Sequence, residues 1–200
     1  MNPFHHPPDD HLLALASGQI SPTHRALVEC HLHFCDVCAS SLADHSLAGG
    51  KLLAEGLGES PPEALFEAVL ARLPEPPRDP GFPVPAPLWS VLRPMAGEHW
   101  RGLFKAGIRY MHLEGGLTLV HAKPGIQFPA HSHEGVEESL ILAGGLRDLT
   151  ECYEMGDYQI RQQGSTHAPV ALDDEDCWLL TSGEDSIRFK GWRSWFQVNK

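Results

Sequence analysis

Seven prolines stand within fourteen residues, from Pro74 to Pro87, and they restrict what this chain can fold into. Proline fixes the backbone angle φ and has no N–H to donate, so a segment this rich in proline forms neither a helix nor a central strand. We expect an extended, semi-rigid linker there. The sequence therefore predicts two domains, at residues 1–74 and 88–200, joined by a linker at residues 75–87.

Helical signals come before the linker. Asp9 or Asp10 can cap a short helix that ends at Gly18, and Ser21 can cap a helix that has Pro22 at its first position. We expect four helices: a short one before Gly18, one after Ser21 that includes His31 and Phe34, one from about Asp36 towards Leu53, and one from Glu63 to Leu73 that Ser60-Pro61 precedes. The last is apolar nearly all round, so it either docks beyond its own domain or packs on the other helices or the second domain.

Short strands come after the linker. Short apolar runs are separated by turns that contain glycine, which is typical of a sandwich or barrel rather than of a parallel sheet. The expected strands include Leu117–Val120, Ser139–Leu142, Tyr158–Arg161, Cys177–Leu180 and Ile187–Phe189. The predicted fold class is a small all-α domain followed by an all-β barrel.

The net charge of −11 narrows the classes of partner. Residues 1–75 contribute −7 of this charge, and no basic stripe is present, so the composition disfavours nucleic acid and favours a basic partner protein. No run of about 18 apolar residues indicates a membrane span. The N-terminus lacks the basic and then apolar pattern of a signal peptide, so we expect a cytoplasmic protein.

His31, Cys35 and Cys38 have the spacing of zinc ligands. On one continuous helix these positions share a face, and the second cysteine still reaches the same ion if the helix breaks near Cys35. A structural zinc takes four ligands, so a fourth must come from elsewhere. His5 and His6 are the nearby candidates, and His11, His24 and His33 are the others. The remaining cysteines (Cys30, Cys152 and Cys177) are expected to be small buried hydrophobic residues.

This pattern, with an upstream histidine in an acidic four-helix domain, resembles the zinc-binding anti-sigma domain. In the ChrR-type members the upstream ligand is the second histidine of a His-His pair, which is His6 in this sequence. The resemblance implies a zinc site formed by His6, His31, Cys35 and Cys38. It also implies that the domain binds an extracytoplasmic-function sigma factor, inserts its helices between the two sigma regions and blocks binding to the core polymerase.

A second ligand set consists of His131, His133, Glu137 and His167. Residues two apart on a strand point to the same side, so His131 and His133 both face the barrel interior. The spacing from Gly125 to Gly144 matches the first cupin motif, and Gly156, Gly164 and His167 match the second, although its proline and asparagine are absent. The resemblance implies a cupin barrel (a double-stranded β-helix, or jelly roll) over roughly residues 88–196. Glu134 and Glu138, beside the set, are expected to be solvated.

Three histidines and one glutamate bind zinc, iron, manganese or nickel, and the spacing does not choose among them. In ChrR-type anti-sigma factors the cupin follows the zinc domain and governs release of sigma under oxidative signals such as singlet oxygen. The leading hypothesis is therefore a negative regulator of transcription that is not an enzyme and binds sigma as a 1:1 heterodimer. Its apolar contacts would come from Leu12, Leu13, Leu15, Phe66, Val69 and Leu70.

Two alternatives stay open at this stage. A cupin dioxygenase that depends on iron and has a helical regulatory arm is compatible with the second ligand set, although it leaves the first set unexplained. A structural zinc scaffold that binds some other transcription protein is the third hypothesis. The native metal of the cupin, the inducing signal, the sigma partner and the route between the domains are not specified by these patterns.

Overall fold

The structure, a computed structural model, describes residues 3–56, 62, 64–72, 100–102, 107–113, 115–182 and 187–189 of the 200-residue chain. The predicted linker at 75–87 lies outside the described residues, as do Ser60, Pro61 and Glu63. The division into domains at these boundaries thus stays a prediction. Within the described ranges, no helix has the length and apolar character needed to cross a membrane.

Four helices form in the described part of the N-terminal region, as the sequence predicts. They are α1 (Asp9–Ala16), α2 (Pro22–His31), α3 (Asp36–Ala54) and α4 (Ala64–Leu70). Ser21 caps α2, because its hydroxyl accepts the backbone N–H of His24 at 3.2 Å. The cap of α1 differs from the prediction, since Pro8 precedes that helix and Asp9 lies in its first turn. Helix α2 ends at His31 and does not reach Phe34.

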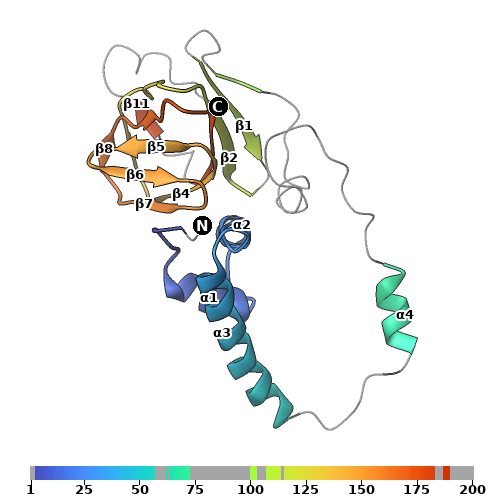
Figure 1. The fold of residues 1–200 in the computed structure, drawn as a ribbon. Coiled ribbons are helices and arrows are strands. Elements are labelled where there is room, and N and C mark those ends of the chain that lie inside the picture. Colours follow the sequence, from blue (N-terminus) through green and yellow to red (C-terminus); the bar gives the residue numbers. More distant parts are fainter. Residues whose placement is uncertain are drawn as a thin grey trace.

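Eleven strands in the described residues pair antiparallel in three sheets. The strands are β1 (Ile108–Leu113), β2 (Leu117–Ala122), β3 (His131–His133), β4 (Glu137–Ala143), β5 (Gly145–Asp148), β6 (Glu151–Glu154), β7 (Tyr158–Arg161), β8 (Thr166–His167), β9 (Val170–Ala171), β10 (Cys177–Ser182) and β11 (Ile187–Phe189). The large sheet has the order β1-β2-β10-β4-β7, and the smaller sheets have the orders β11-β3-β8 and β6-β5-β9. Together they form the barrel of Figure 1, and each of the five expected strands is present.

The central strands of the large sheet are buried on both faces. Every residue of β2 and β10 is buried, so these strands lack the alternation of a sheet with one solvated face. In β4, Ile141 packs in the core inside the barrel, whereas its neighbours Leu140 and Leu142 pack in a second core outside it. The outer face of this sheet therefore requires a cover.

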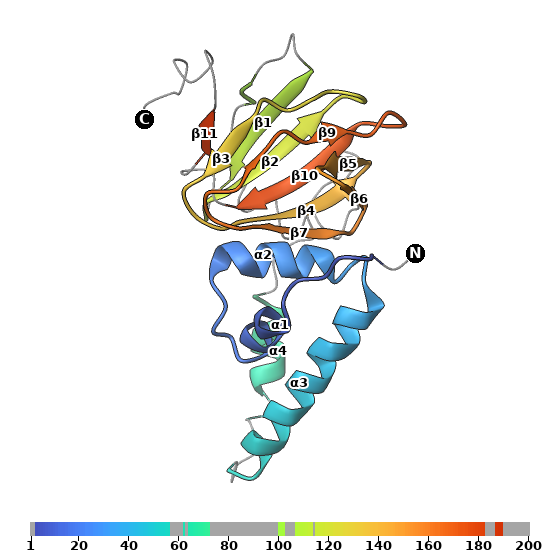
Figure 2. The same ribbon diagram turned by 90° about the vertical axis from the view of Figure 1, so that its left-hand side faces the viewer.

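Helix α2 provides that cover. Ala26, Leu27 and Cys30 pack in the same apolar cluster as residues of the sheet, which include Leu140, Leu142, Tyr158, Trp178 and Leu180. Figure 2 shows α2 lying across the barrel beneath β4 and β7, with α1 and α3 on its far side. Burying Leu27 completely contributes roughly 2–3 kcal/mol. The start of the chain and the barrel thus share one hydrophobic core.

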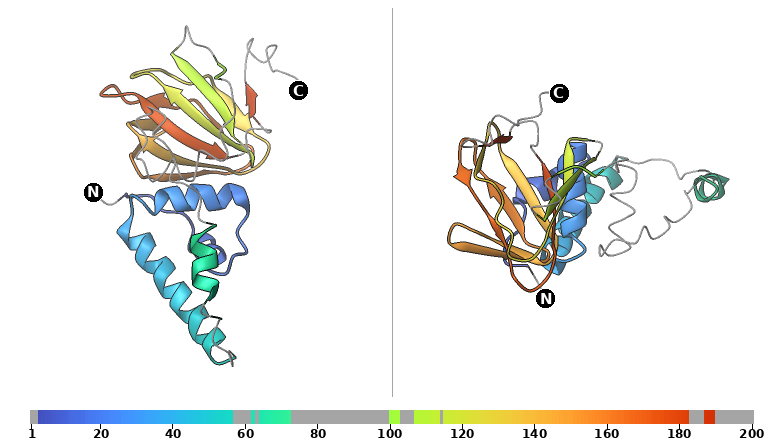
Figure 3. Two further views of the ribbon diagram at one scale, coloured as in Figure 1. Left: turned by 90° about the vertical axis from the view of Figure 1, so that its right-hand side faces the viewer. Right: turned by 90° about the horizontal axis from the view of Figure 1, so that it is seen from above.

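Helices α3 and α4 leave apolar side chains exposed. Leu47, Leu52 and Leu53 of α3 are 60–74% exposed, and α4 exposes Leu65, Phe66, Val69 and Leu70. Helix α4 stands apart from α1–α3 in Figure 1 and in the right-hand view of Figure 3. Of the alternatives for this helix, packing on the other three helices is not the arrangement found among the described residues.

Candidate metal centres

The first ligand set comes together at the junction of α2 and α3. The Nδ1 atom of His6 lies 3.3 Å from the sulfur of Cys35 and 3.4 Å from that of Cys38. One nitrogen of His31 completes a group whose four ligand atoms all lie within 4.8 Å of one another. Of the upstream histidines that were open as a fourth member, His6 is the one in this group.

A break in the helix brings these side chains together. His31 is the last residue of α2, Cys35 is the N-cap of α3 with an extended φ of −127°, and Cys38 lies in the first turn. The sulfur of Cys35 accepts the backbone N–H of Cys38 at 3.4 Å. A helix N-terminus carries a partial positive charge, and the sulfur of Cys35 lies beside it.

The ring of His31 is oriented by the barrel. Its Nδ1–H donates to the carbonyl of Gly156 at 2.8 Å, in the turn between β6 and β7. Its Nε2 is buried and has no hydrogen-bond partner among the residues that the structure describes. Burial lowers the pKa of His31 to about 4, which keeps the ring neutral at pH 7. A neutral imidazole with a buried, unpartnered nitrogen is the form that binds a metal ion.

The same turn positions the N-terminal segment. Asp157 accepts the backbone N–H groups of Phe4 and His5 at 2.7 and 2.9 Å, and the backbone N–H of Tyr158 donates to the carbonyl of His5 at 3.0 Å. His6 is thereby held beside the cysteines.

Gly156 in this turn cannot be replaced without strain. Its φ is +93°, and a Cβ there would lie 2.7 Å from the Cβ of Phe34. Only glycine permits both this backbone conformation and this close approach. The glycine therefore lets the turn reach the helices closely enough for its carbonyl to bind His31.

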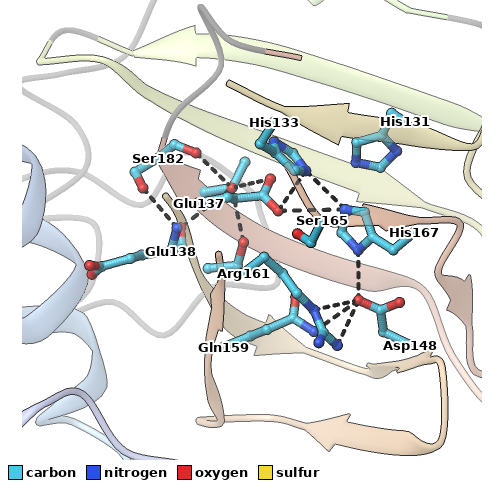
Figure 4. Close-up of polar contacts among 12 residues, drawn as sticks. His131, His133, Glu137, Glu138, Asp148, Gln159, Arg161, Ser165, His167 and Ser182 are labelled. Carbon is cyan, nitrogen blue, oxygen red and sulfur yellow. Dashed lines mark hydrogen bonds and ion pairs between the residues drawn. The ribbon is translucent and has the colours of Figure 1, made fainter. Parts of the chain in front are cut away.

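The second ligand set lies inside the barrel. His131 and His133 are on β3, Glu137 begins β4, and His167 is on β8, where it pairs with His131. The Nε2 atoms of His133 and His167 are 2.9 Å apart, and a carboxylate oxygen of Glu137 lies 3.2 Å from His133 and 3.8 Å from His167. All four ligand atoms lie within 4.8 Å of one another. Figure 4 shows His133, Glu137 and His167 pointing toward a common point.

Buried hydrogen bonds orient these side chains. His131 donates from Nδ1 to the carbonyl of Pro129 at 2.7 Å, and Thr181 donates to Glu137 at 3.0 Å. These two bonds fix the direction of one ring and of the carboxylate.

The ring of His167 is oriented by a second carboxylate. It donates from Nδ1 to Asp148 at 2.7 Å. Asp148 is itself fully buried and is held by Arg161 at 2.8 Å. A carboxylate on the far nitrogen of a histidine is the usual partner of a metal ligand.

The electrostatics match a bound cation. Burial lowers the pKa of His133 to about 4 and raises that of Glu137 to about 6. Burial also tends to raise the pKa of Asp148, but its bonds to His167 and Arg161 hold it below its usual value. In the first set, burial raises the pKa of Cys38 to about 12. A divalent cation would offset these costs, because it stabilises thiolates and carboxylates and needs neutral imidazoles.

The two sets differ in donor chemistry. Thiolate with imidazole suits a closed structural zinc site, whereas three imidazoles and a carboxylate suit a divalent ion with open positions. In the set inside the barrel, Nδ1 of His167 is bonded to Asp148, which leaves its Nε2 atom 2.9 Å from Nε2 of His133. The residues present therefore fit a metal ion at both places, and their chemistry does not select the metal of the second.

Asp148, Arg161 and Asp157 are functional residues that the sequence patterns missed. Asp148 lies on β5 and Arg161 on β7, and neither belongs to a spacing motif. Asp157 follows Gly156, which the sequence indicates only as a turn. Each of the three acts on a ligand through a contact between segments that are distant in the sequence.

Two expectations about burial are wrong. Glu138 was expected to be solvated, but it is only 6% exposed. It lies on β4 next to Glu137, so its side chain points to the opposite face, toward the helices (Figure 4). Cys152 was expected to be buried, but it is exposed on β6, whereas Cys30 and Cys177 are buried as expected.

Comparisons with known proteins agree with this architecture. The family model for the ChrR cupin-like domain matches residues 92–185. The anti-sigma-E factor ChrR of Cereibacter sphaeroides is 32% identical over 196 residues, which cover 92% of each chain. The crystal structure of Rhodobacter sphaeroides SigE in complex with the anti-sigma ChrR aligns with a TM-score of 0.68 and 32% identity, over 90% of this chain and 98% of that one.

Proposed function

The chain belongs to the ChrR family of anti-sigma factors, and from that premise we propose that it binds and inhibits an extracytoplasmic-function sigma factor in the cytoplasm as a 1:1 heterodimer. The observation on which this depends most is the likeness to ChrR in the SigE complex, which extends over both the helices and the barrel. Membership of an anti-sigma family argues against the alternative of a cupin dioxygenase, because the chain is then a regulator and not an enzyme.

The first ligand set would hold a structural zinc ion. His6, His31, Cys35 and Cys38 come from three separate segments, so one ion would join all of them. The core around them is small: Leu12, Val28, Cys35 and Cys38 form the buried cluster under α1 and α3. A metal bound there supplies folding energy directly, because the site does not exist in the unfolded chain. The zinc would thus maintain the helices in the arrangement that binds sigma.

The exposed apolar side chains of α3 and α4 are the proposed contact surface. Phe66, Val69 and Leu70 are 45–66% exposed, and apolar groups at this density favour burial against a partner. Leu13 is also exposed, at 53%. Leu12 does not qualify, since it is 3% exposed and packs beneath the zinc ligands. Leu15 is partly buried against the same cluster.

The second ligand set would hold a divalent metal (zinc, iron, manganese or nickel) in the domain that senses an oxidative signal and triggers release of sigma. The contacts of the β6–β7 turn support a route by which a structural change in the barrel would reach the first ligand set. Gly156 binds His31 of the first set, and Asp157 binds the segment that leads to His6.

Strand β7, which follows this turn, also contacts the second ligand set. From β7, Arg161 binds Asp148, which orients His167. A change at the barrel metal would thus reach the zinc ligands through one strand and the turn before it.

The test of the first domain uses matched cysteine variants of the full chain. We expect the wild-type protein and Cys152→Ser to co-purify with a co-expressed cognate sigma factor, whereas Cys35→Ser loses zinc and about tenfold or more in affinity. Cys152 is the control because it is exposed and lies on β6, outside the ligand sets. Equal binding by Cys35→Ser, or no binding by the wild-type protein, would contradict the proposal.

The sensing role has a separate test. The wild-type complex and one carrying His133→Gln would be exposed to singlet oxygen, generated by a photosensitiser, and then to a peroxide. We expect sigma release only from the wild-type complex, measured as sigma-dependent transcription by added core polymerase. Release at the same rate from both complexes would show that the barrel metal has no part in sigma release. It would not contradict the proposal that the chain binds sigma.

A further inference from the structure

A third cluster of ligand-type side chains lies between the helices and the barrel, away from both sites described above. It consists of His11 on α1, His24 on α2 and Glu138 on β4. One ligand atom of each residue lies within 4.8 Å of the others. The three side chains come from three elements, so the cluster bridges the interface at which the helical layer meets the outer face of the large sheet.

The spacing in this cluster suits a shared cation better than hydrogen bonds. The Nδ1 atom of His11 lies 3.6 Å from one carboxylate oxygen of Glu138, and the Nε2 atom of His24 lies 3.5 Å from the other. Hydrogen bonds to a carboxylate are shorter, at about 2.7–2.9 Å. Two ligands of a tetrahedral zinc ion stand about 3.3 Å apart, given bonds of about 2.0–2.1 Å. In the part of the chain that the structure describes, the buried Nδ1 atom of His11 has no hydrogen-bond partner.

Neighbouring hydroxyl groups orient His24 and Glu138 in the way that outer hydrogen bonds orient the ligands of a metal ion. The other ring nitrogen of His24, Nδ1, lies 3.1 Å from the hydroxyl of Ser21. The hydroxyl of Tyr158 donates to Glu138, and the hydroxyl of Ser182 accepts the backbone N–H of Glu138. Such outer partners fix a ligand's tautomer and direction.

Glu138 also lacks a permanent positive partner. Within the described ranges its ion-pair partners are His11 and His24 alone, and it is 6% exposed. A buried carboxylate without a positive charge is costly. The side chains of His11 and His24 are 18% and 37% exposed, so water reaches one side of the cluster.

We propose that His11, His24 and Glu138 form a third, exchangeable site for a divalent transition metal, which links α1 and α2 to β4. Two imidazoles and one carboxylate are a donor set for zinc or iron(II), with the remaining positions left to water. The proposal does not depend on sigma binding. Its consequence is mechanical: occupancy of the site would hold the helical layer against the barrel, and loss of the ion would loosen it.

Metal stoichiometry of the full-length protein tests the proposal. Wild-type protein, His24→Gln, His11→Gln and the control His33→Gln would be dialysed against the same low concentration of free zinc, and bound zinc measured by mass spectrometry. His33 is exposed and belongs to none of the three clusters. We expect His24→Gln and His11→Gln each to bind one zinc fewer per chain than the wild type, and His33→Gln to bind the same number.

Three further readouts separate a specific loss of metal from misfolding of the variants. Circular dichroism should show the same helix content in all four proteins, and cobalt(II) should give one weaker, water-coordinated spectrum that only the two cluster variants lack. In the wild type, the last equivalent of zinc should slow amide exchange in α1 and α2 by about fivefold or more. Equal stoichiometry in wild type and both cluster variants, or the same loss in His33→Gln, would overturn the proposal.

Discussion

Neighbouring residues of β4 serve opposite sides of one sheet. Glu137 points into the barrel and joins His133 and His167, while Glu138 points outward and meets His11 and His24. The alternation of side chains along a strand accounts for this separation. Both glutamates are only 6% exposed, so the neighbouring histidines, rather than water, must stabilise their carboxylates. A single strand thereby connects the barrel cluster to the helical layer.

Asp148→Asn should weaken metal binding in the barrel and leave the first set intact. The amide keeps the shape of Asp148 but removes the charge that His167 contacts at 2.7 Å. Loss of such an outer partner typically reduces metal affinity by about 10–100-fold. Competition with a chelator measures the effect on each site. Asp174→Asn is the matched control, because Asp174 is exposed in the same barrel; equal affinities in the two variants would contradict the role of Asp148.

Metal-free protein should lose stability as the pH falls from 6.5 toward 4. Burial lowers the pKa of His31 and His133 from 6.5 to about 4, so in this window the unfolded chain binds protons that the folded chain does not. Glu137, whose pKa burial raises to about 6, acts in the opposite direction between its ordinary value and 6, and offsets part of the loss.

Urea midpoints at three pH values, near 7, 6 and 5, measure this loss in chelator-treated protein. We expect the midpoint of the wild type to fall at each step, and His31→Gln to fall less steeply because one titrating ring is absent. His33→Gln, which changes an exposed histidine, should follow the wild type. A midpoint that rises or stays level toward the lowest pH would show that burial of these rings does not govern the acid response.

Among the elements, the short β6–β7 turn is needed to hold the first ligand set in place. Gly156→Ala should disturb the first ligand set, since the new Cβ would lie 2.7 Å from Phe34 and 2.8 Å from Pro3. Gly164→Ala is a matched control: its φ is also positive, at +76°, but nothing lies within 4 Å of the added Cβ. Both variants incur about 1–2 kcal/mol for a left-handed alanine.

Only Gly156→Ala should also lower zinc affinity in the first set, because the carbonyl of Gly156 orients His31. Chelator competition and urea unfolding of both variants separate the two effects. If Gly164→Ala loses zinc from the first set to the same extent, the turn has no special role in holding His31.

Elements whose signals are local could be predicted from the sequence. Ser21-Pro22 marked the start of α2, and Tyr158–Arg161 and Ile187–Phe189 coincide with β7 and β11. The expected start of a helix near Asp36 agrees with α3, whereas α2 ends at His31 and does not include Phe34. The motifs and the family resemblance named all eight members of the two ligand sets, but Asp148 reaches His167 only through the pairing of strands.

For the whole molecule, the shared core predicts cooperative unfolding. Leu27→Ala removes a fully buried side chain from the cluster between α2 and the sheet, and large-to-small changes of this kind cost about 2–5 kcal/mol. Leu52→Ala is the control, since Leu52 is 74% exposed on α3 and should change stability by less than about 0.5 kcal/mol.

Calorimetry of the full chain should show α2 and the barrel melting in one transition that Leu27→Ala shifts downward as a unit. Separate transitions, with only the smaller one shifted, would mean that the helices fold independently of the barrel.

The proline-rich segment led to the prediction of two domains, but its composition contains no information on whether the flanking parts touch. The signal for that contact lies in β4 instead. Leu140 and Leu142 pack toward α2, while Ile141 between them packs in the barrel core. A strand that is apolar on both faces needs a cover on each, and here the outer cover is α2, which precedes the proline-rich segment in the sequence.

The packing of α2 on the barrel also limits how the helices of this chain can be combined with another barrel. A chimera that joins these helices to another barrel would leave Leu27 and Cys30 without the surface that includes Leu140 and Tyr158. It would also remove the carbonyl of Gly156, which orients the ring of His31. A replacement barrel would therefore have to keep the outer face of β4, β7 and β10, so the helices and the barrel of this chain can be exchanged only as one unit.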